Sequence, residues 1–267
     1  KAIKTKKIIA IRPSSLPLHA YKELKKNKLL NIKEFKGKES IFSIKSDPEI
    51  ARIEKAAKLT DILYAELIDN WKSFITEADA AQFLLTKMAE RGIEPSFDPI
   101  IASGSNAANP HHSHTQTKLN KGFCVIDMGI RYQGYCSDMT RTIYIGKPSK
   151  AEKELYEKIR EAQVETVALV APGLRIQDLD IFCRKKLGKE LNKQFIHTLG
   201  HGLGTQVHEW PRVSNNVNIK LQPGMYITIE PGVYKQGSYG IRIEDDILVT
   251  SKKHKVLTSS SKVLIEV

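Results

Sequence analysis

The chain carries one pattern of residues twice, in two stretches that lie far apart in the sequence. Residues 127–134 read Asp-Met-Gly-Ile-Arg-Tyr-Gln-Gly, and residues 230–237 read Glu-Pro-Gly-Val-Tyr-Lys-Gln-Gly. An acid, a glycine, an aliphatic residue and a final Gln-Gly pair occupy the same places in both. Each stretch then reaches a second carboxylate on the expected return strand, Asp138 in the first copy and Glu244 in the second. The repetition predicts an internally duplicated domain that brings four acids to one place.

The hydrophobic pattern changes along the chain from helical to strand-like and back. Ser46-Asp47-Pro48-Glu49 supplies an N-cap, a proline at the first helical position and acids in the first turn, which predicts the start of a helix. The expected helices are about 47–72, 77–91, 151–169 and 176–191, and the expected strands are 100–104, 123–130, 133–145, 225–234 and 239–249. This order predicts an α+β domain with an antiparallel sheet, in place of alternating βαβ units.

Residues 1–45 differ from the rest of the chain. They contain a short apolar run, Ile8 to Ile11, then a Lys-rich segment of helical character and a short strand expected around Ile41-Phe42. Such a segment is too short for an independent core. We therefore interpret residues 1–45 as the remnant of a shortened N-terminal domain and residues 46–267 as the main domain of the chain. Because the chain begins without Met, we also expect an upstream portion to be absent or removed.

Composition excludes several classes of function. The chain contains no apolar run long enough for a membrane span and no signal peptide after its Lys-rich start, so we expect a cytoplasmic protein. Three cysteines without a C-x-x-C spacing indicate neither a disulfide framework nor a thiolate metal site. The net charge of +12 raises the question of a nucleic-acid partner. The lysines are spread out without interleaved aromatic residues, so we expect none.

The four acids of the repeat lie among apolar neighbours, where an unpaired charge costs several kcal/mol. They must therefore pair with arginines or coordinate cations. The acids are Asp127, Asp138, Glu230 and Glu244, and the arginines available for separate ion pairs are Arg131, Arg141 and Arg242. For any one acid the ion pair is the simpler interpretation. Four acids in two copies, accompanied by histidines, favour a metal site.

The histidines come from residues 197–208, which contain His197, His201 and His208, with Gly200 and Gly202 on either side of the middle one. The glycines suggest a backbone brought close to a ligand. Four carboxylates and one imidazole suit two divalent ions about 3.5 to 4 Å apart, bridged by carboxylates. Oxygen-rich ligation favours Mn²⁺, with Co²⁺, Fe²⁺ and Zn²⁺ as alternatives.

From about residue 46 to about residue 250 the chain resembles the pita-bread-fold metallopeptidases, which include Xaa-Pro aminopeptidase, Xaa-Pro dipeptidase (prolidase) and methionine aminopeptidase. The motifs that carry the resemblance are Ile-Asp-Met-Gly at 126–129, Gly-Tyr-Cys-Ser-Asp-Met-Thr-Arg-Thr at 134–142, Gly-His-Gly-Leu-Gly at 200–204, Val-His-Glu at 207–209, Ile-Glu-Pro-Gly-Val-Tyr at 229–234 and Gly-Ile-Arg-Ile-Glu-Asp at 240–245. The resemblance implies a pita-bread fold, with internally duplicated halves around an antiparallel sheet.

The resemblance also implies a role for each matching residue. Asp127 would bind one metal, Asp138 and Glu244 would bridge both, and His201 and Glu230 would bind the other. Glu230 would also act as general base on the water between the metals.

Further residues of the motifs would serve the substrate. His111 and His208 would contact it and stabilise the tetrahedral intermediate, although His112 and His114 lie close enough to compete with His111 for this assignment. Beside these, His197 would support the substrate and metal site, and Arg242 would brace the bridging carboxylates by charge-assisted hydrogen bonds.

Within the family, the Ser-Asp-Met-Thr-Arg-Thr and Val-His-Glu-x-Pro runs resemble the Xaa-Pro branch. We therefore expect a metallopeptidase that uses a metal-bridging hydroxide to hydrolyse the bond before proline, at the N-terminus of peptides or in Xaa-Pro dipeptides. Its substrate would be a peptide with proline at the second position, whose bond resists ordinary peptidases because the proline nitrogen has no hydrogen. Methionine aminopeptidase activity and a non-catalytic binding module are the alternatives, and a homodimer is open.

Overall fold

The computed structural model describes residues 7–11, 17–26, 30–34 and 42–267, and the chain divides into two compact units, Lys1–Ser40 and Ile41–Val267. In the first unit, β1 (Lys7–Ile11) pairs in parallel with β2 (Leu30–Glu34), and α1 (Leu18–Lys26) lies between them in the sequence. Of the strand expected at Ile41-Phe42, Ile41 lies outside the described residues and Phe42 is in a turn. The origin of this unit as a remnant of a larger domain stays a prediction.

Four long helices belong to the second unit: α2 (Asp47–Asp69), α3 (Glu77–Glu90), α4 (Lys150–Leu169) and α5 (Ile176–Gln194), with short 3₁₀ helices η2 (Trp71–Ser73) and η3 (Gly104–Ala108). The helix start expected at Ser46 is confirmed, because Ser46 and Glu49 form a capping box. The helix ends at Asp69, before the expected 72, because the chain tightens into η2. Among the described residues, no helix combines the length and apolarity needed to cross a bilayer.

The strands confirm the internal duplication. In the first copy, β5 pairs antiparallel with β8 and encloses the β6–β7 hairpin, while in the second copy β11 pairs with β14 and encloses the β12–β13 hairpin. The strands of the two copies are β5 (Gly122–Met128), β6 (Ile130–Tyr132), β7 (Tyr135–Cys136), β8 (Met139–Ile145), β11 (Tyr226–Ile229), β12 (Gly232–Lys235), β13 (Tyr239–Arg242) and β14 (Asp245–Val249). Each copy thus folds as a strand, a small hairpin and a return strand.

The remaining strands extend these sheets. They are β3 (Glu94–Pro95), β4 (Ile100–Ser103), β9 (Gly200–Gly202), β10 (Glu209–Val213) and β15 (His254–Val256). β4 joins β5 and β8, and β3 joins the β6–β7 hairpin, whereas β10, β9 and β15 build the second copy into a sheet of order β10-β9-β11-β14-β15. Except for the parallel pair β1–β2 in the first unit, the pairings between these strands are antiparallel, as the sequence predicts.

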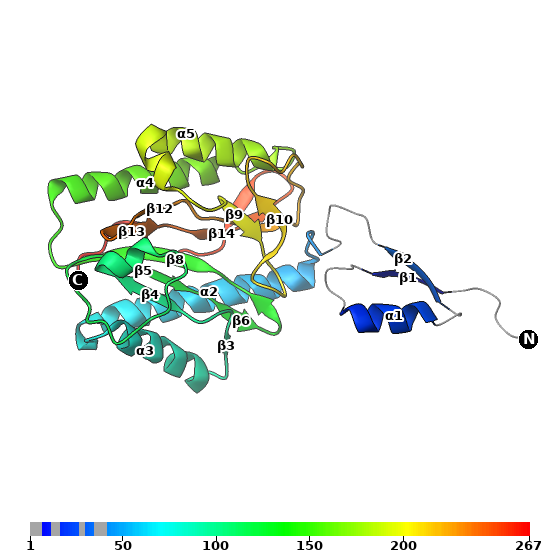
Figure 1. Ribbon diagram of the computed structural model, residues 1–267, viewed down its shortest axis with the longest axis horizontal. Helices are drawn as coiled ribbons and strands as arrows, with labels where there is room; N and C mark the ends of the chain where they lie inside the picture. The colour runs from blue at the N-terminus through cyan, green and yellow to red at the C-terminus, as the bar shows by residue number, and fades with distance from the viewer. Residues whose placement is uncertain (1–6, 12–16, 27–29, 35–41) are drawn as a thin grey trace, which may run out of the picture. The chain divides into compact units, whose positions relative to one another are not determined.

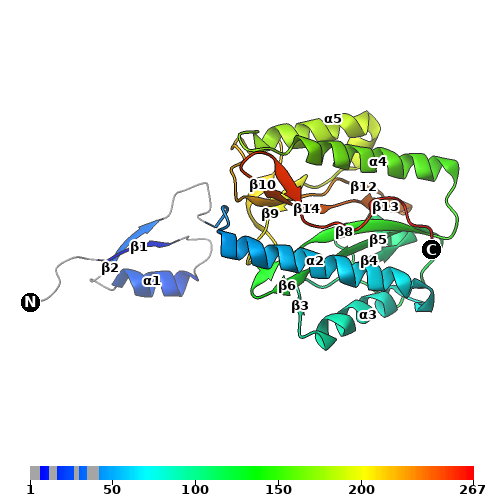
Figure 2. The ribbon, with the colours of Figure 1, turned by 180° about the vertical axis from the view of Figure 1, so that it is seen from behind.

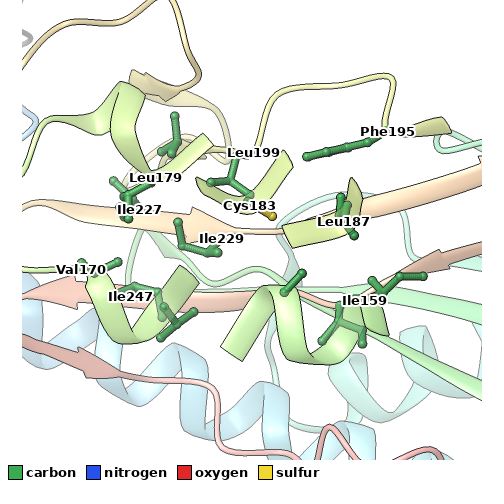
Figure 3. Close-up of a cluster of buried hydrophobic side chains, with 14 of the residues drawn as sticks. Ile159, Val170, Leu179, Cys183, Leu187, Phe195, Leu199, Ile227, Ile229 and Ile247 are labelled. Carbon is green, nitrogen blue, oxygen red and sulfur yellow. The ribbon is translucent and has the colours of Figure 1, made fainter. Parts of the chain in front are cut away.

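Helices cover the strands on two sides of the second unit. Figures 1 and 2 show α2 and α3 on one side, α4 and α5 on the other, and the strands of both copies between them. Helices α4 and α5 pack mainly on the second copy, whereas α2 and α3 pack on the first copy and α2 also contacts the second. Figure 3 shows Ile159, Leu179, Cys183 and Leu187 of α4 and α5 directed at the second copy, where Ile227, Ile229 and Ile247 meet them. A second core packs α2 and α3 on β5, β6 and β8.

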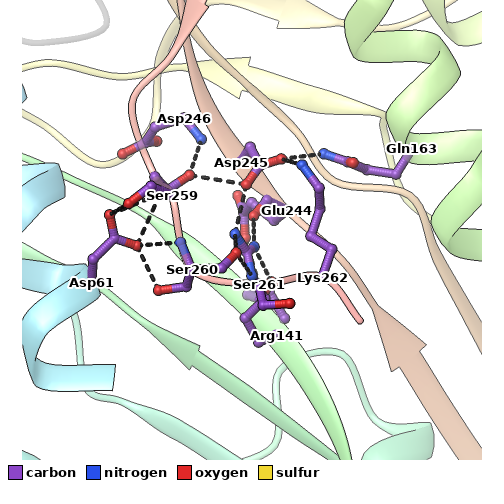
Figure 4. A network of polar contacts seen from close by, with 12 residues as sticks. Asp61, Arg141, Gln163, Glu244, Asp245, Asp246, Ser259, Ser260, Ser261 and Lys262 are labelled. Atoms are coloured by element: carbon purple, nitrogen blue, oxygen red, sulfur yellow. Dashed lines mark hydrogen bonds and ion pairs between the residues drawn. The ribbon is translucent and has the colours of Figure 1, made fainter. Parts of the chain in front are cut away.

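A buried polar network ties the two copies together. Arg141 of β8 donates from Nη2 to Asp245 Oδ1 of β14 at 2.7 Å, and both side chains are almost fully buried. Two residues of the C-terminal segment also belong to this network (Figure 4). Ser260 O accepts hydrogen bonds from Arg141, and Lys262 Nζ lies 2.5 Å from Asp245 Oδ2. On the other side, Asp61 of α2 accepts hydrogen bonds from the backbone of Ser260. The backbone that carries Glu244 is thereby fixed between the copies.

Candidate active site

Every site residue expected from the sequence lines one cavity of about 930 Å³. The residues are His111, Asp127, Asp138, His197, His201, His208, Glu230, Arg242 and Glu244. They come from segments scattered over more than half of the chain. Their convergence is a property of the fold, while their roles in binding metal or substrate stay predictions at this point.

The duplicated strands explain where the four acids lie. Asp127 is the last residue but one of β5, and Glu230 directly follows the matching strand β11. Asp138 directly precedes β8, and Glu244 directly precedes the matching return strand β14. In each copy, therefore, one acid lies at the end of the outgoing strand and one at the start of the return strand. His201 of β9 joins them, because β9 pairs with β11.

Three of these carboxylates keep a buried oxygen that has no hydrogen-bond partner in the described part of the chain. The atoms are Asp127 Oδ1, Asp138 Oδ1 and Glu244 Oε1. A buried unsatisfied acceptor of this kind costs about 1 to 3 kcal/mol, and more when charged. Asp138, His201 and Glu244 offer ligand atoms that all lie within 4.8 Å of one another. This donor set fits a divalent cation, which would satisfy the unpartnered oxygens.

Burial and mutual repulsion act on the acids in the same direction. They raise the pKa of Asp138 and of Glu230 well above the usual range, with the charge of Glu244 as the next contribution in both cases. Burial, followed by the charge of Asp127, raises the pKa of Glu244 to about 8. A compact group of like charges without a cation is thus unfavourable, and a bound cation would reverse the preference for protonation.

The ring of His201 is neutral, which is the state that a metal ligand requires. Burial, and then the neighbouring His208, lower the pKa of His201 to about 3. Its Nδ1 lies 3.1 Å from Gly202 O, and because a carbonyl can only accept, Nδ1 carries the proton. The lone pair of Nε2 then faces Asp138 Oδ2 at 3.6 Å and Glu230 Oε1 at 3.4 Å. A second group that orients an imidazole in this way is common in metal sites.

Arg242 was expected to contact Asp138 and Glu244, but the carboxylate that it contacts directly is Asp127. Its Nη2 donates to Asp127 Oδ2 at 2.6 Å, whereas Asp138 is not among its partners. Its Nε donates to Thr140 Oγ1 at 3.0 Å, and Thr140 Oγ1 in turn donates to Glu244 Oε2 at 2.6 Å. Arg242 therefore braces Asp127 directly and Glu244 through a hydroxyl. The expected direct hydrogen bonds from Arg242 to Asp138 and Glu244 are therefore wrong.

The alternative of four separate ion pairs is also wrong. Arg242 pairs with Asp127, but Arg141 pairs with Asp245, which the repeat does not include. Arg131 donates to the backbone carbonyl of Thr205. Within the described residues, Asp138, Glu230 and Glu244 form no salt bridge with an arginine or a lysine.

Hydrogen bonds distinguish the three histidines near residue 111. His112 Nε2 lies 2.8 Å from Glu77 Oε2, and His114 Nδ1 lies 3.1 Å from Pro99 O. His111 lines the cavity with an exposed side chain, and its ring makes no hydrogen bond to any residue that the structure describes. The geometry thus favours His111 over its neighbours as the group available to a substrate.

The other histidines of the cavity are held by their surroundings. The rings of His208 and His201 lie 4.4 Å apart, in an edge-to-face arrangement. His197 donates from Nδ1 to Thr198 O at 2.8 Å, so its Nε2 accepts from Tyr234 OH at 3.0 Å. Burial, with the nearby charge of Arg242, lowers the pKa of His197 to about 4, which keeps its ring neutral.

The glycines on either side of His201 allow close packing between neighbouring strands. A Cβ on Gly200 would come within 2.1 Å of Thr228 O, and one on Gly202 within 2.4 Å of Trp210 O. The backbone of β9 is therefore close to its neighbouring strands, and its expected closeness to a ligand stays a prediction. Side chains at these positions would push His201 out of the sheet.

Sequence reasoning overlooked some residues that surround the site. Tyr234 accepts a hydrogen bond from Arg242 Nη1 at 2.8 Å, and Arg212 of β10 lines the cavity with an exposed side chain. Thr140 lies inside the motif at 134–142 and Tyr234 inside that at 229–234, so the motifs themselves contained the signal. Arg212 follows Val-His-Glu by a short distance on an unpredicted strand, and no pattern marked it.

This geometry defines a class of protein: a duplicated antiparallel fold with carboxylates and an imidazole converging between its halves is that of a pita-bread metallopeptidase. The sequence matches metallopeptidase family M24 over residues 51–251. It is 41% identical to the Xaa-Pro dipeptidase of Pyrococcus horikoshii over 272 residues, 99% of this chain and 77% of that protein. An uncharacterized peptidase of Staphylococcus aureus is 40% identical over 82% of this chain and 64% of its own length.

Solved structures agree with the sequence matches. The prolidase of Pyrococcus horikoshii has a TM-score of 0.89 at 39% identity, with 97% of this chain and 76% of that chain covered. The X-Pro aminopeptidase of Thermotoga maritima has a TM-score of 0.90 at 30% identity, with 98% and 76% covered. The chain belongs to metallopeptidase family M24. Its pita-bread fold and its membership of an enzyme family, both expected from the sequence, are confirmed.

Proposed function

We propose that this chain is a two-metal peptidase that hydrolyses the bond before proline, with Xaa-Pro dipeptides as its preferred substrates. The observation that carries the proposal is the cavity in which five potential ligands and four further histidines converge. The relatives support the choice of substrate, because those at 41% and 39% identity carry the names Xaa-Pro dipeptidase and prolidase. Oxygen-rich ligation favours Mn²⁺, with Co²⁺, Fe²⁺ and Zn²⁺ as alternatives.

Five residues would hold two divalent ions: Asp127, Asp138, His201, Glu230 and Glu244. When bound, such ions supply positive charge that polarises the scissile carbonyl and attracts the free amino terminus. The unpartnered oxygens of Asp127, Asp138 and Glu244 are the atoms that this arrangement would satisfy. His201 contributes the neutral Nε2, whose orientation its own Nδ1–H bond to Gly202 O fixes.

The chain's own groups then handle protons and substrate. Glu230, whose carboxyl burial shifts towards protonation, accepts the proton of the attacking water and passes it to the departing proline nitrogen. His111 and His208 donate hydrogen bonds to the oxygen that gains charge in the transition state. His197 and Tyr234 support Arg242, which keeps Asp127 in place.

The ends of a dipeptide match the charges of the cavity. The carboxylate cluster suits a free ammonium group, and Arg212, exposed at the cavity, suits a free carboxylate. Arg212 lies opposite His201 in the β9–β10 pair, so it stands on a strand next to the cluster. A longer peptide would place an uncharged peptide group where a dipeptide places its carboxylate. The cavity therefore favours dipeptides.

The test is hydrolysis of Ala-Pro, Ala-Pro-Ala and Met-Ala-Ala by metal-stripped protein, with and without added Mn²⁺. We expect Mn²⁺-dependent cleavage of Ala-Pro above that of Ala-Pro-Ala, and its loss in the Asp138→Asn variant. Faster cleavage of Ala-Pro-Ala would point to an aminopeptidase, and cleavage of Met-Ala-Ala alone to a methionine aminopeptidase. A folded, metal-loaded sample that cleaves none of them would favour a non-catalytic binding module.

Three further expectations go with this proposal and stay predictions. They are a cytoplasmic location, a homodimeric state as an open alternative to the monomer, and a function that involves no nucleic-acid partner. Sedimentation of the full chain tests the second, and retention on a nucleic-acid column at physiological salt tests the third.

A further inference from the structure

His111 reaches the cavity on a loop, residues 109–121, and a buried carboxylate outside the cavity holds that loop. Glu77 is the first residue of α3, its side chain is fully buried, and it is not among the residues that line the cavity. Its oxygens accept hydrogen bonds from two neighbouring segments. The donors are Ser103, Asn106, His112 and Thr115.

The two oxygens of Glu77 have separate tasks. Oε1 accepts from Ser103 N at 2.8 Å and from Asn106 Nδ2 at 3.0 Å, which holds η3 and the end of β4. Oε2 lies 2.8 Å from His112 Nε2 and 3.2 Å from Thr115 Oγ1, which holds the loop itself. Because a carboxylate only accepts, His112 donates from Nε2. The site of Glu77 at the start of α3 also favours a negative charge.

The loop is fixed on both sides of His111. On one side, Pro110 O accepts from Arg242 Nη1 at 3.3 Å, and on the other side His112 donates to Glu77. Beyond His112, Thr115 O accepts from Ala78 N at 2.9 Å, so the loop also rests on the first turn of α3. His111 is the single residue between the two anchors.

We propose that Glu77 and His112 form a positioning pair that sets the place of His111 in the cavity. His111 depends on this pair because its own ring has no hydrogen-bond partner among the described residues and its side chain is exposed. Neither member of the pair would react with substrate. A displacement of His111 of about 1 Å can cost about 100-fold in rate, so Glu77 matters although it lies outside the cavity that His112 and His111 line.

The kinetic test uses Glu77→Gln, which keeps the shape but turns an acceptor into a donor that faces donors. It rests on the proposed function, in which His111 stabilises the transition state. We expect kcat/KM for Ala-Pro to fall about 10- to 100-fold in Glu77→Gln. His112→Ala should lose a similar factor, and His112→Gln should recover most of it, because a glutamine amide can donate from nearly the same position as Nε2.

A double mutant separates positioning from a general loss of structure. If Glu77 acts through His111, adding Glu77→Gln to His111→Ala costs little beyond His111→Ala alone, since there is no imidazole left to misplace. Asp79→Asn is the matched control. Asp79 lies on the same turn of α3 and caps it with Thr76 but is exposed, so this variant should keep kcat/KM within about twofold. Penalties that multiply in the double mutant would overturn the proposal.

A second measurement does not depend on peptidase activity. In Glu77→Gln, hydrogen exchange of the amides in residues 111–117 should accelerate at least about tenfold, while the amides of β5, β8 and α5 keep their wild-type rates. Unchanged exchange in the loop, or equal acceleration throughout, would overturn the proposal. If the wild-type protein cleaves no peptide, the proposed function fails, and the exchange measurement alone decides whether Glu77 holds the loop.

Discussion

Under the proposed function, Arg212 is the residue that would bind the free carboxylate of a dipeptide. It is exposed at the cavity, and within the described residues it has no salt-bridge partner. We expect Arg212→Gln to raise KM for Ala-Pro by about 10- to 100-fold, because a charged hydrogen bond of about 1.5 to 3 kcal/mol to the substrate carboxylate is lost. The KM for Ala-Pro-amide, which lacks that carboxylate, should change little.

Steady-state kinetics with both substrates measure the difference. Arg175→Gln serves as the control, since Arg175 is also exposed but pairs with Asp178 on α5. If Arg212→Gln raises KM equally for Ala-Pro and Ala-Pro-amide, Arg212 does not bind the substrate carboxylate.

Thr140 links two charged groups by a single hydroxyl, which accepts from Arg242 Nε and donates to Glu244 Oε2. Thr140→Val keeps the shape and removes both bonds. We expect Mn²⁺ affinity, measured by titration calorimetry, to fall about 10- to 100-fold, as is usual when a ligand loses its supporting hydrogen bond. Thr142→Val is the control, because the Thr142 hydroxyl bonds, among the described residues, only to the backbone of Arg242. Equal Mn²⁺ affinity in the two variants would contradict this role.

The segment between β9 and β10 carries His208, and a buried ion pair anchors its end. Lys45 Nζ lies 3.0 Å from Glu209 Oε2, with the Lys45 side chain only 2% exposed. Glu209 Oε1 accepts hydrogen bonds from Thr205 Oγ1 and Gln206 N, both at 3.0 Å. The pair thus ties the segment to the chain just before α2.

Removing one partner leaves the other charge buried and unpaired. We expect Lys45→Met to lower the free energy of unfolding by about 3 kcal/mol, and Lys45→Met with Glu209→Gln to cost clearly less than the sum of the single changes. Urea unfolding of the four proteins in the cycle gives the coupling. A coupling energy below about 0.5 kcal/mol would show that the contact contributes little.

At the scale of elements, the bounds of the helices were predicted best, because local sequence patterns determine them. The capping residue Ser46 and the apolar spacing placed the four long helices to within a few residues. The strand expected at 133–145 begins instead after a turn, in which Gln133 adopts φ 47°, and it is divided into β7 and β8 by Ser137 and Asp138. β9 went unpredicted since Gly200–Gly202 has no strand propensity, and only its pairing with distant strands makes it extended.

The site was predictable to the extent that the repeat and the motifs mark it. The nine expected residues share one cavity, yet their contacts were not readable from the sequence. Arg242 was expected on the bridging acids but contacts Asp127, 115 positions away, and Glu77 holds His112 across 35 positions. Such contacts depend on how strands from both copies meet. No local pattern specifies them.

At the scale of the molecule, the site lies between the two copies and both are needed to build it. Asp127 of the first copy is held by Arg242 of the second, and Thr140 of the first copy holds Glu244 of the second. The ion pair between Arg141 of β8 and Asp245 of β14 also joins the two copies. A cation bound by acids of both copies would therefore stabilise the contact between them, so folding and metal binding should be coupled.

This coupling predicts opposite pH dependences with and without metal. In the metal-free protein, the pKa of Glu244 is raised from 4.5 to about 8, so the folded state binds more protons than the unfolded state between these values. Stability should then decrease as the pH rises from 4.5 to about 8, by an amount on the order of 1 to 3 kcal/mol. With excess Mn²⁺, stability should increase over the same range, because the ligands must lose protons to bind the ion.

Urea unfolding across this pH range, with chelator or with Mn²⁺, measures both profiles. At about 100 times its dissociation constant, Mn²⁺ should add about 2.7 kcal/mol. Glu244→Gln should flatten the metal-free profile and lose most of the gain from Mn²⁺, since the repelled carboxylate and one ligand disappear together. Glu54→Gln, which removes only a partner of Lys255 at the surface, should leave both profiles unchanged. If metal-free stability instead rises with pH, the acids do not repel one another in the folded chain, and their convergence would not by itself require a cation.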